Sequence, residues 1–302
     1  MSAAPDGLRD LDASALRDWP LPGTGDIADK EDRGQVLVVA GSREIPGAAL
    51  LAATAALRAG AGKLTIATGR GMAAHLALAV PESRVIALDE SDDGTLLPSG
   101  LEALQSCAQG CAAVLVGPGL TGGQDCGGFL SALMHLLQAS AAPGTLPIVL
   151  DALGMDAILD GSFARHPPQP VLITPHAGEM AHLTGLGKEH IQAEPLTVAT
   201  DTARHRQVLV ALKGATTFIA SPEGSAWRHT GGNPGLATSG SGDVLAGIVT
   251  GLAARGAPLA QAAAWGVVIH ALAGQRLSQR HGPVGFLARE LLDEIPGVMR
   301  SL

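Results

Sequence analysis

Residues 233–247, NPGLATSGSGDVLAG, begin as a glycine-rich loop and continue into an apolar run with the spacing of a buried helix. Gly240 and Gly242 have no Cβ, so the backbone can turn tightly there and approach a bound group closely. The helix that follows directs its unpaired N–H groups and the positive end of its dipole toward this loop. This arrangement binds anions, and we expect a phosphate group at this position.

Asp243 places a carboxylate at the mouth of the predicted anion site, where it would repel a phosphate unless it has a chemical role. The role that fits is a general base that takes the proton from a hydroxyl attacking a phosphoryl group. The alternative is an ordinary aspartate that complements the helix dipole. We favour the base because Asp243 ends the whole glycine-rich string. The N–H groups of Gly240, Ser241, Gly242 and Asp243 would then stabilise the transferring phosphoryl group.

The composition sets the class of protein. The chain has 302 residues, 46% hydrophobic and 16% charged, which suits one large or two small domains. A net charge of −8 argues against a general nucleic-acid binder but leaves room for a nucleotide held by loops and helix ends. Residues 256–275 are uncharged, but they include Pro258 and Gln261, so we expect a buried helix and no membrane span. No signal-peptide pattern opens the sequence.

The cysteines, Cys107, Cys111 and Cys126, form no CxxC pair and have no histidines at zinc spacing. Cys107 and Cys111 have a spacing that allows them to share one helix face, but small buried thiols are the simpler interpretation. Free thiols fit a reducing compartment, and we expect a cytoplasmic protein.

Apolar runs alternate with helical patterns along most of the chain. Residues 36–40 predict a buried strand, residues 48–58 a helix and residues 64–67 the next strand, a βαβ unit. Further strands are expected at 113–116, 148–150, 171–173 and 208–212, and further helices at 101–107, 129–137, 197–206, 242–254 and 259–278. Residues 216–220 and 225–228 predict a hairpin that adds antiparallel strands at one edge.

The predicted fold is therefore α/β, with a mostly parallel central sheet, helices on both faces and an antiparallel hairpin edge. Residues 1–32 are polar and loop-like and read as an N-terminal arm, and residues 33–302 as one domain. Special residues follow three of the strands, in the loops at 117–119, at Asp151 and at 174–176. Ligands of open α/β sheets bind outside the carboxyl ends of the strands, so these loops should converge on the site.

Several other motifs mislead. Residues 60–65, GAGKLT, look like the end of a P-loop, but Leu57 replaces its first glycine and Leu64 its Ser or Thr. The segment also runs from helix to strand, which is the wrong order. Residues 41–47 lack the GxGxxG pattern of a dinucleotide site, and no serine lies in a GxSxG context. P-loop enzymes, NAD-dependent dehydrogenases and serine hydrolases are therefore disfavoured.

Seen together, the segments from about residue 33 to 274 resemble one family, the ADP- or ATP-dependent NAD(P)H-hydrate dehydratases of the ribokinase-like fold. The resemblance rests on the order and combination of short motifs: GQVLVVAGS (34–42), PGA (46–48), RAGAG (58–62), VGPGL (116–120), TPHAGEM (174–180), LKGATT (212–217), the opening stretch and IHALAG (269–274). Some members carry an epimerase domain in the same chain. We expect the epimerase to be a separate protein here, because residues 1–32 are too few to hold it.

The resemblance implies a repair reaction on the hydrated forms of NADH and NADPH, which carry a hydroxyl on C6 of the reduced nicotinamide ring. ADP or ATP phosphorylates the hydroxyl of the S-epimer, and phosphate is then expelled. Asp243 would act as the base, and Mg²⁺ is expected to bridge the nucleotide phosphates. We lean toward ADP as the donor, and the resemblance also implies homo-oligomeric assembly.

Ligand-binding positions follow from the same resemblance. Ala48, Gly119, His176 and Asp243 match positions that contact the hydrated dinucleotide, and at Gly119 only a missing side chain would leave room for it. Contacts to the AMP portion of the donor match Lys213, Gly214, Ala215, Thr216, Thr217 and Gly242. Alone, His176 would be read as a capping or surface histidine and Lys213 as a solvated turn lysine.

Two positions are less settled. Glu179 matches a carboxylate that organises Mg²⁺ through water in related kinases, although a helix-start carboxylate is the simpler alternative. Leu153 stands where the family often has a second aspartate, and Asp156 is the candidate replacement. The alternative function is a vitamin kinase of the same fold that phosphorylates a hydroxymethylpyrimidine or thiazole alcohol.

Overall fold

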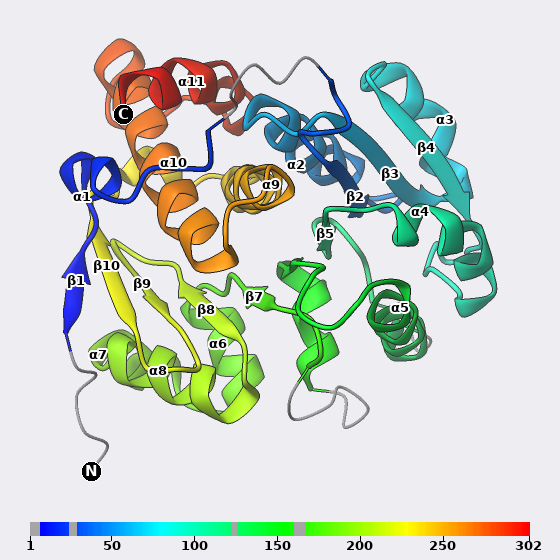
Figure 1. The fold of residues 1–302 in the computed structure, drawn as a ribbon, viewed down its shortest axis with the longest axis horizontal. Helices are drawn as coiled ribbons and strands as arrows, with labels where there is room; N and C mark the ends of the chain where they lie inside the picture. Colours follow the sequence, from blue (N-terminus) through cyan, green and yellow to red (C-terminus); the bar gives the residue numbers. More distant parts are fainter. Residues whose placement is uncertain (1–6, 24–28, 123–125, 160–166) are drawn as a thin grey trace.

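The computed structural model describes residues 7–23, 29–122, 126–159 and 167–302. Its centre is a sheet with the strand order β1-β10-β9-β8-β7-β6-β5-β2-β3-β4 (Figure 1). The strands from β8 to β4 in this order are all parallel: β8 Leu209–Leu212, β7 Val171–Ile173, β6 Ile148–Leu150, β5 Ala113–Val116, β2 Gln35–Val39, β3 Lys63–Gly69 and β4 Ser83–Leu88.

The predicted antiparallel edge is confirmed. Strand β9, Thr216–Ala220, runs antiparallel to β8, and β10, Ala226–Thr230, runs antiparallel to β9. Residues 221–225 form the tight turn between β9 and β10. Gly224 allows this turn, because its φ of +98° is a conformation that other residues disfavour.

Helices cover both faces of the sheet (Figure 1). Alternate residues of β2 point to opposite faces, so Val36 and Val38 belong to one core cluster and Leu37 and Val39 to the other. The first cluster is packed by α2 Pro46–Arg58, α3 Arg70–Ala79, α9 Ser241–Ala254, α10 Leu259–His281 and α11 Ala288–Ser301. The second is packed by α4 Gln105–Gln109, α5 Cys126–Ser140, α6 Ala177–Thr184, α7 Lys188–Ala193 and α8 Pro195–Arg206.

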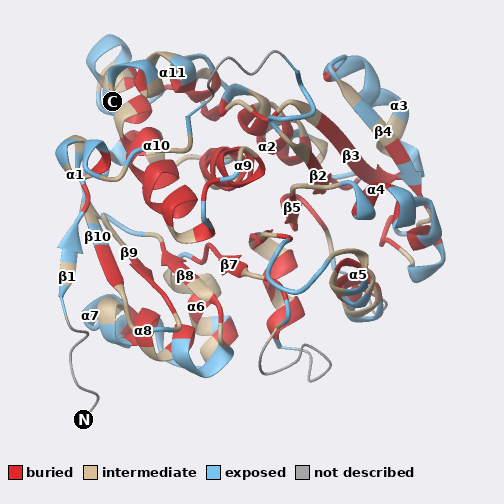
Figure 2. Ribbon diagram, in the orientation of Figure 1, coloured by how far each residue is buried: buried red, intermediate tan, exposed pale blue. Residues whose placement is uncertain are grey.

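Helix α9 is enclosed almost on every side (Figure 2). Gly247 and Gly251 let it lie directly against α2, because a Cβ at either position would collide with the backbone carbonyl of Ala52 or Ala56. The close approach places the start of α9 beside α2, and a Cβ on Gly240 would be 2.5 Å from Leu51 Cδ1. The abundance of glycine and alanine thus serves the packing that positions the predicted anion site.

The loop-like interpretation of the N-terminal arm is wrong for two segments. Strand β1, Leu8–Asp10, pairs in parallel with β10 and extends the sheet, and α1, Ala13–Arg17, follows it. An exposed sheet edge readily accepts such a strand. Trp19 then stacks on Trp227 with ring centroids 5.8 Å apart, and its carbonyl accepts a 2.8 Å hydrogen bond from Trp265 Nε1. These contacts bind the arm to the domain.

Further elements outside the predicted set are the helices α3, α6, α7 and α11 and the edge strand β4. Most of the uncharged stretch at 256–275 lies in α10, which is a buried helix of the first core cluster, as predicted. Within the described ranges, no helix combines the length and the apolar character needed to cross a membrane.

Candidate active site

The loops after β6, β7 and β8 meet at one edge of the sheet. The sequence predicted this for the loops after β6 and β7, and the loop after β8 joins them. Asp151 follows β6, Thr174 follows β7 and Lys213 follows β8. The Thr174 hydroxyl donates to Asp151 Oδ1 at 2.6 Å, and Lys213 Nζ donates to the same oxygen at 3.0 Å. The backbone N–H of Lys213 bonds to the carbonyl of Pro175 at 2.8 Å. Neighbouring strand ends thus assemble a buried polar cluster from residues far apart in the sequence.

Carboxylates surround the Lys213 ammonium group. Besides Asp151, Glu179 Oε2 lies 3.8 Å from Nζ. Burial opposes the charge on Lys213, but the surrounding carboxylates, Asp151 first, outweigh burial and raise its pKa. One cation among several carboxylates leaves the cluster negative, so a further cation bound with the phosphates would complete its charge balance.

Asp243 lies in the first turn of α9 and shares this field. Burial, and after it the negative charges of Asp151 and Glu179, raise the pKa of its carboxyl group, Lys213 lowers it, and the net pKa is about 7. A carboxyl group with a pKa near neutrality is suited to exchange protons in catalysis. The structure therefore places a tuned carboxyl group where the sequence predicted a base.

The loop before α9 has the geometry of an anion site. Gly240 adopts a left-handed φ of +88°, and the first intrahelical hydrogen bond joins Val244 N to Gly240 O at 3.1 Å. The N–H groups of Gly242 and Asp243 precede that bond and have no acceptor within the helix. A Cβ on Gly242 would lie 3.3 Å from Lys213 Nζ, so a glycine keeps the lysine close to the helix start. Backbone donors and an ammonium group therefore converge on one spot.

A contact within this loop was not predicted. Ser241 Oγ lies 2.9 Å from His270 Nε2, which comes from α10. Burial lowers the pKa of His270 to about 4, against a hydrogen bond with Ser241 that raises it, so the ring is neutral at neutral pH. His270 carried only a family motif in the sequence. Asp151 was noted as a strand-end residue but received no role, since its pairing with Lys213 joins positions far apart in the chain.

His176 and Glu179 form a reciprocal cap at the start of α6. His176 Nδ1 accepts hydrogen bonds from the N–H groups of Gly178 at 2.9 Å and Glu179 at 3.1 Å. Glu179 Oε2 accepts one from the N–H of His176 at 2.7 Å. Both residues therefore act as helix caps, the simpler alternative for each. Glu179 also contacts the cluster through Lys213, whereas the His176 side chain is largely exposed.

At the other end of the crevice, Ala48 and Gly119 lie against each other. Ala48 is buried in the first turn of α2. Gly119 has a φ of +65°, and a Cβ there would lie 2.5 Å from the carbonyl oxygen of Ile45 and 2.7 Å from Ala48 Cβ. Protein packing therefore requires glycine here. The expectation that a missing side chain leaves room for the ligand is wrong as a reason, because protein atoms fill that space.

The segment matched to AMP contacts begins inside the cluster and runs out of it. After Lys213, Gly214 and Ala215 are exposed, and Thr216 and Thr217 open strand β9 at intermediate burial. The segment therefore starts at the anion site and reaches the surface within two residues.

The donor set for a metal is small. Among the described residues, no group of three or more His, Cys, Asp or Glu side chains could hold a metal ion by themselves. Mg²⁺ usually keeps several waters and uses one or two carboxylates together with substrate phosphates. Asp151 and Glu179, both beside the anion loop, fit that pattern.

The position of the family's second aspartate carries the apolar side chain of Leu153. Leu153 lies in the 3₁₀ turn Ala152–Ile158, and its methyl groups would be 3.6 Å from a Cβ on Gly122. Asp156 Oδ1 is 3.0 Å from His182 Nε2 on α6. Asp156 is thus engaged with a surface histidine.

Comparison with known proteins fits this geometry. A ribokinase-like superfamily protein from Enterococcus faecalis superposes with a TM-score of 0.80 at 24% identity, covering 100% of this chain and 98% of that one. The fold and the anion loop at a helix start thus define a ribokinase-like α/β protein. Residues 36–297 match the family described as NAD(P)H-hydrate dehydratase, and the chain belongs to this family.

Individual relatives agree. The ADP-dependent (S)-NAD(P)H-hydrate dehydratase of Xanthomonas campestris is 44% identical over 295 residues, 98% of this chain and 97% of that protein. The bifunctional NAD(P)H-hydrate repair enzyme of Moorella thermoacetica is 38% identical over 89% of this chain, which spans 50% of that longer protein. The Bacillus subtilis ADP/ATP-dependent NAD(P)H-hydrate dehydratase, co-crystallised with ATP/Mg²⁺, superposes with a TM-score of 0.77 at 27% identity, covering 97% of this chain and 98% of that one. These matches favour the dehydratase over the vitamin kinase.

Proposed function

We propose that this chain is an ADP-dependent dehydratase that returns the S-epimer of hydrated NADH or NADPH to the reduced dinucleotide. The observation that supports this proposal is the carboxyl group of Asp243, whose pKa is raised to about 7 at the start of α9 beside Lys213. Phosphoryl transfer needs a base for the attacking hydroxyl and donors for the phosphoryl oxygens. Both lie within one helical turn here.

In the proposed reaction, Asp243 accepts the proton of the C6 hydroxyl as that oxygen attacks the β-phosphorus of ADP, and AMP leaves. The N–H groups of Gly242 and Asp243, in the loop that begins at Gly240 and Ser241, hold the oxygens of the transferring group. Lys213 neutralises part of their charge. Electrons from the ring nitrogen then expel phosphate from C6, and loss of the C5 proton restores the ring double bond.

Mg²⁺ fits this site. Asp151 and, through water, Glu179 would hold it, and it would neutralise charge on the nucleotide phosphates. Because Lys213 already neutralises Asp151, the ion would depend on the phosphates for most of its ligands.

The ligand positions belong to the same proposal. Ala48, Gly119 and His176 are assigned to the hydrated dinucleotide, together with Asp243. The segment that begins at Lys213 holds the AMP portion of the donor: Lys213, Gly214, Ala215, Thr216, Thr217 and Gly242. Strand order supports this division, because β8 and β9 lie on one side of β7 and β6, and β5 and β2 lie on the other.

The organisation of the enzyme remains a prediction on three points. Residues 1–32 are assigned to an arm and residues 33–302 to one domain. A separate epimerase would supply the S-epimer, as the fused domains of the bifunctional relatives suggest. We expect a homo-oligomer in the cytoplasm, where the free thiols of Cys107, Cys111 and Cys126 would stay reduced.

The test is recovery of the NADH absorbance band when the purified protein meets hydrated NADH with Mg²⁺ and either ADP or ATP. Recovery with ADP, accompanied by equal amounts of AMP and phosphate, supports the proposal. A stable phosphorylated organic product would instead indicate a kinase. No recovery with either donor, from protein that still binds nucleotide, would refute the proposed activity.

A further inference from the structure

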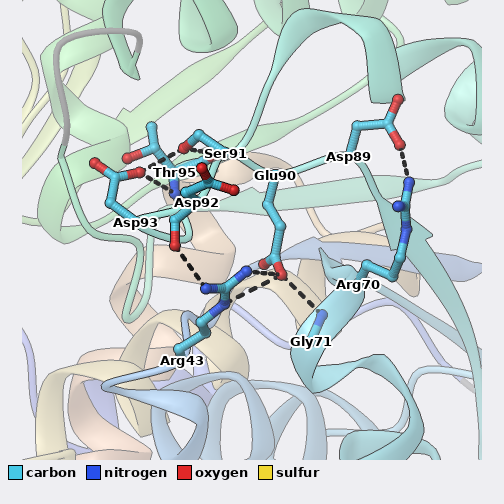
Figure 3. Close-up of polar contacts among 9 residues, drawn as sticks. All are labelled: Arg43, Arg70, Gly71, Asp89, Glu90, Ser91, Asp92, Asp93 and Thr95. Atoms are coloured by element: carbon cyan, nitrogen blue, oxygen red, sulfur yellow. Dashed lines mark hydrogen bonds and ion pairs between the residues drawn. The ribbon is translucent and has the colours of Figure 1, made fainter.

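A buried carboxylate lies outside the cluster described above, at the opposite end of the same sheet edge. Glu90 follows β4, and its side chain is only 7% exposed. One of its oxygens, Oε1, accepts three hydrogen bonds: from Arg43 Nη2 at 2.6 Å, from Arg43 Nε at 3.2 Å and from the backbone N–H of Gly71 at 3.0 Å (Figure 3). A buried carboxylate with three donors is firmly held, because each donor compensates its desolvation.

These hydrogen bonds join the ends of three neighbouring strands. Arg43 lies in the loop after β2, Gly71 begins α3 directly after β3, and Glu90 follows β4. Arg43 Nη1 also donates to the carbonyl of Asp92 at 2.8 Å. The fit is close, since a Cβ on Gly69 would collide with Glu90 Oε2 and one on Gly94 would lie 3.3 Å from Arg43 Cδ.

The loop that Arg43 belongs to forms the β2 end of the proposed site. Two residues after Arg43, Ile45 directs its carbonyl at the space beside Gly119, and its side chain is 48% exposed. Ser42 Oγ accepts the N–H of Ile45 at 3.1 Å, and α2 with Ala48 begins at once. Any shift of Arg43 would therefore move the surface that Ala48 and Gly119 share.

We propose that Glu90 is a positioning residue for the hydrated dinucleotide: through Arg43 and the start of α3, it fixes the β2–α2 loop against which the substrate binds. This inference rests on the proposed function. Charge argues against an alternative, a phosphate site at Arg43. Two guanidinium groups, Arg43 and Arg70, face four carboxylates in this group of residues: Asp89, Glu90, Asp92 and Asp93 (Figure 3).

The same edge offers a matched control. Arg70 pairs with Asp89, which also accepts from Ser99 Oγ at 3.0 Å. This second arginine–carboxylate pair is more exposed, with side chains 71% and 40% accessible, and neither residue has a contact with the β2–α2 loop among the interactions of the described residues. Its removal changes charge at the edge as the removal of Glu90 does, without releasing the loop.

The experiment compares Glu90→Gln with Asp89→Asn in steady-state assays. We expect Glu90→Gln to raise the KM for hydrated NADH about five- to tenfold, with kcat and the KM for ADP within about twofold of wild type. Asp89→Asn should change none of the three. Arg43→Gln should match Glu90→Gln, and the double variant should be no worse than either single variant, because both break one connection.

Amide hydrogen exchange of residues 41–47 tests, without substrate, whether Glu90 fixes the β2–α2 loop. Exchange should accelerate in Glu90→Gln and stay unchanged in Asp89→Asn. An unchanged hydrate KM in Glu90→Gln would overturn the inference, as would a joint rise of both KM values with a fall in kcat. If the wild type does not turn over the hydrate, the proposed function is refuted on its own. In that case, unchanged exchange in Glu90→Gln would refute the role of Glu90 in fixing the β2–α2 loop.

Discussion

The two ends of the proposed site differ in the kind of residue that forms them. The phosphoryl end, formed by Asp151, Lys213 and Asp243, consists of charged side chains held close together in a buried place. The hydrate end is the packed surface formed by Ile45, Ala48 and Gly119, whose side chains are not ionisable, and a methyl group added at Gly119 would collide with its neighbours. The phosphoryl end therefore acts through charge, and the hydrate end acts through close packing.

This difference separates two kinds of damage. A substitution of equal size at the phosphoryl end keeps the packing and removes chemistry, so turnover should fall while the fold persists. A small enlargement at the hydrate end leaves every catalytic group in place but displaces backbone, so stability and substrate affinity should suffer first.

The largest effect is expected from Asp243→Asn, which tests whether charge is essential at the phosphoryl end. Asparagine has the same shape but cannot accept the hydroxyl proton. We expect kcat to fall about 10³-fold, the usual contribution of a general base, with the Kd for ADP within a few-fold of wild type. Turnover assays with calorimetric ADP titration measure both values. Near-wild-type turnover would remove Asp243 from the mechanism.

Lys213→Met should have the next largest effect. It removes the cation that lies 3.0 Å from Asp151 and close to the start of α9. We expect kcat/KM to fall about 10²-fold, as when one donor to a transition-state oxyanion is lost. Because Lys213 lowers the pKa of Asp243, and the base must be ionised to act, the acidic limb of the pH–rate profile should move to higher pH in this variant. Lys188→Met on exposed α7 serves as the control, and an unmoved limb would contradict the electrostatic coupling.

Much of the phosphoryl end was predictable because its signals are local. Strands β5, β6, β7 and β9 occur with the predicted bounds, since each is a short apolar run closed by turn residues. Strands β6, β7 and β8 are parallel, so their carboxyl ends share one edge, which brings Asp151, Thr174 and Lys213 together. Glycine at 240 and 242 marked the helix start.

The other features depend on distant contacts that leave no local pattern. Arg43 and Glu90 are separated by more than a βαβ unit, and nothing beside either residue indicates the pair. Ser241 and His270 lie on different helices. Strand β1 carries few apolar residues, because it lies at an edge where little of it is buried. The reason for glycine at 119 was misread, because the position of Ile45 cannot be inferred from sequence.

Gly119→Ala tests the hydrate end. The new methyl group would lie 2.5 Å from the Ile45 carbonyl, at a residue whose φ of +65° already favours glycine. We expect the free energy of unfolding to fall by about 2–4 kcal/mol and the hydrate KM to rise, with the KM for ADP unchanged. Denaturant titration and steady-state kinetics measure these effects. Gly127→Ala is the matched control, because a Cβ there meets nothing within 4 Å on a helix. Equal stability of the two variants would refute the packing argument.

The smallest expected effect has the opposite sign and concerns the stability of Asp243→Asn. The pKa of Asp243 is about 7 in the folded protein against a usual 3.8, so folding favours its protonated form. That contribution is complete below about pH 4 and is lost as the pH rises through 7. Asparagine is neutral throughout, so the variant should be more stable than wild type at pH 8 by about 1–2 kcal/mol, less than the full pKa shift because Asp243 is only partly buried and solvent screens its charge.

Below about pH 3 the two proteins should unfold at the same denaturant concentration, because the carboxyl group is then neutral in both the folded and the unfolded state. A variant less stable than wild type at pH 8 would show that Lys213 compensates the buried charge fully. A gain at pH 8 would instead show that the phosphoryl end holds its charge at the expense of stability. The close packing at the hydrate end, where one added methyl group destabilises the fold, would then be the part of the proposed site that contributes to stability.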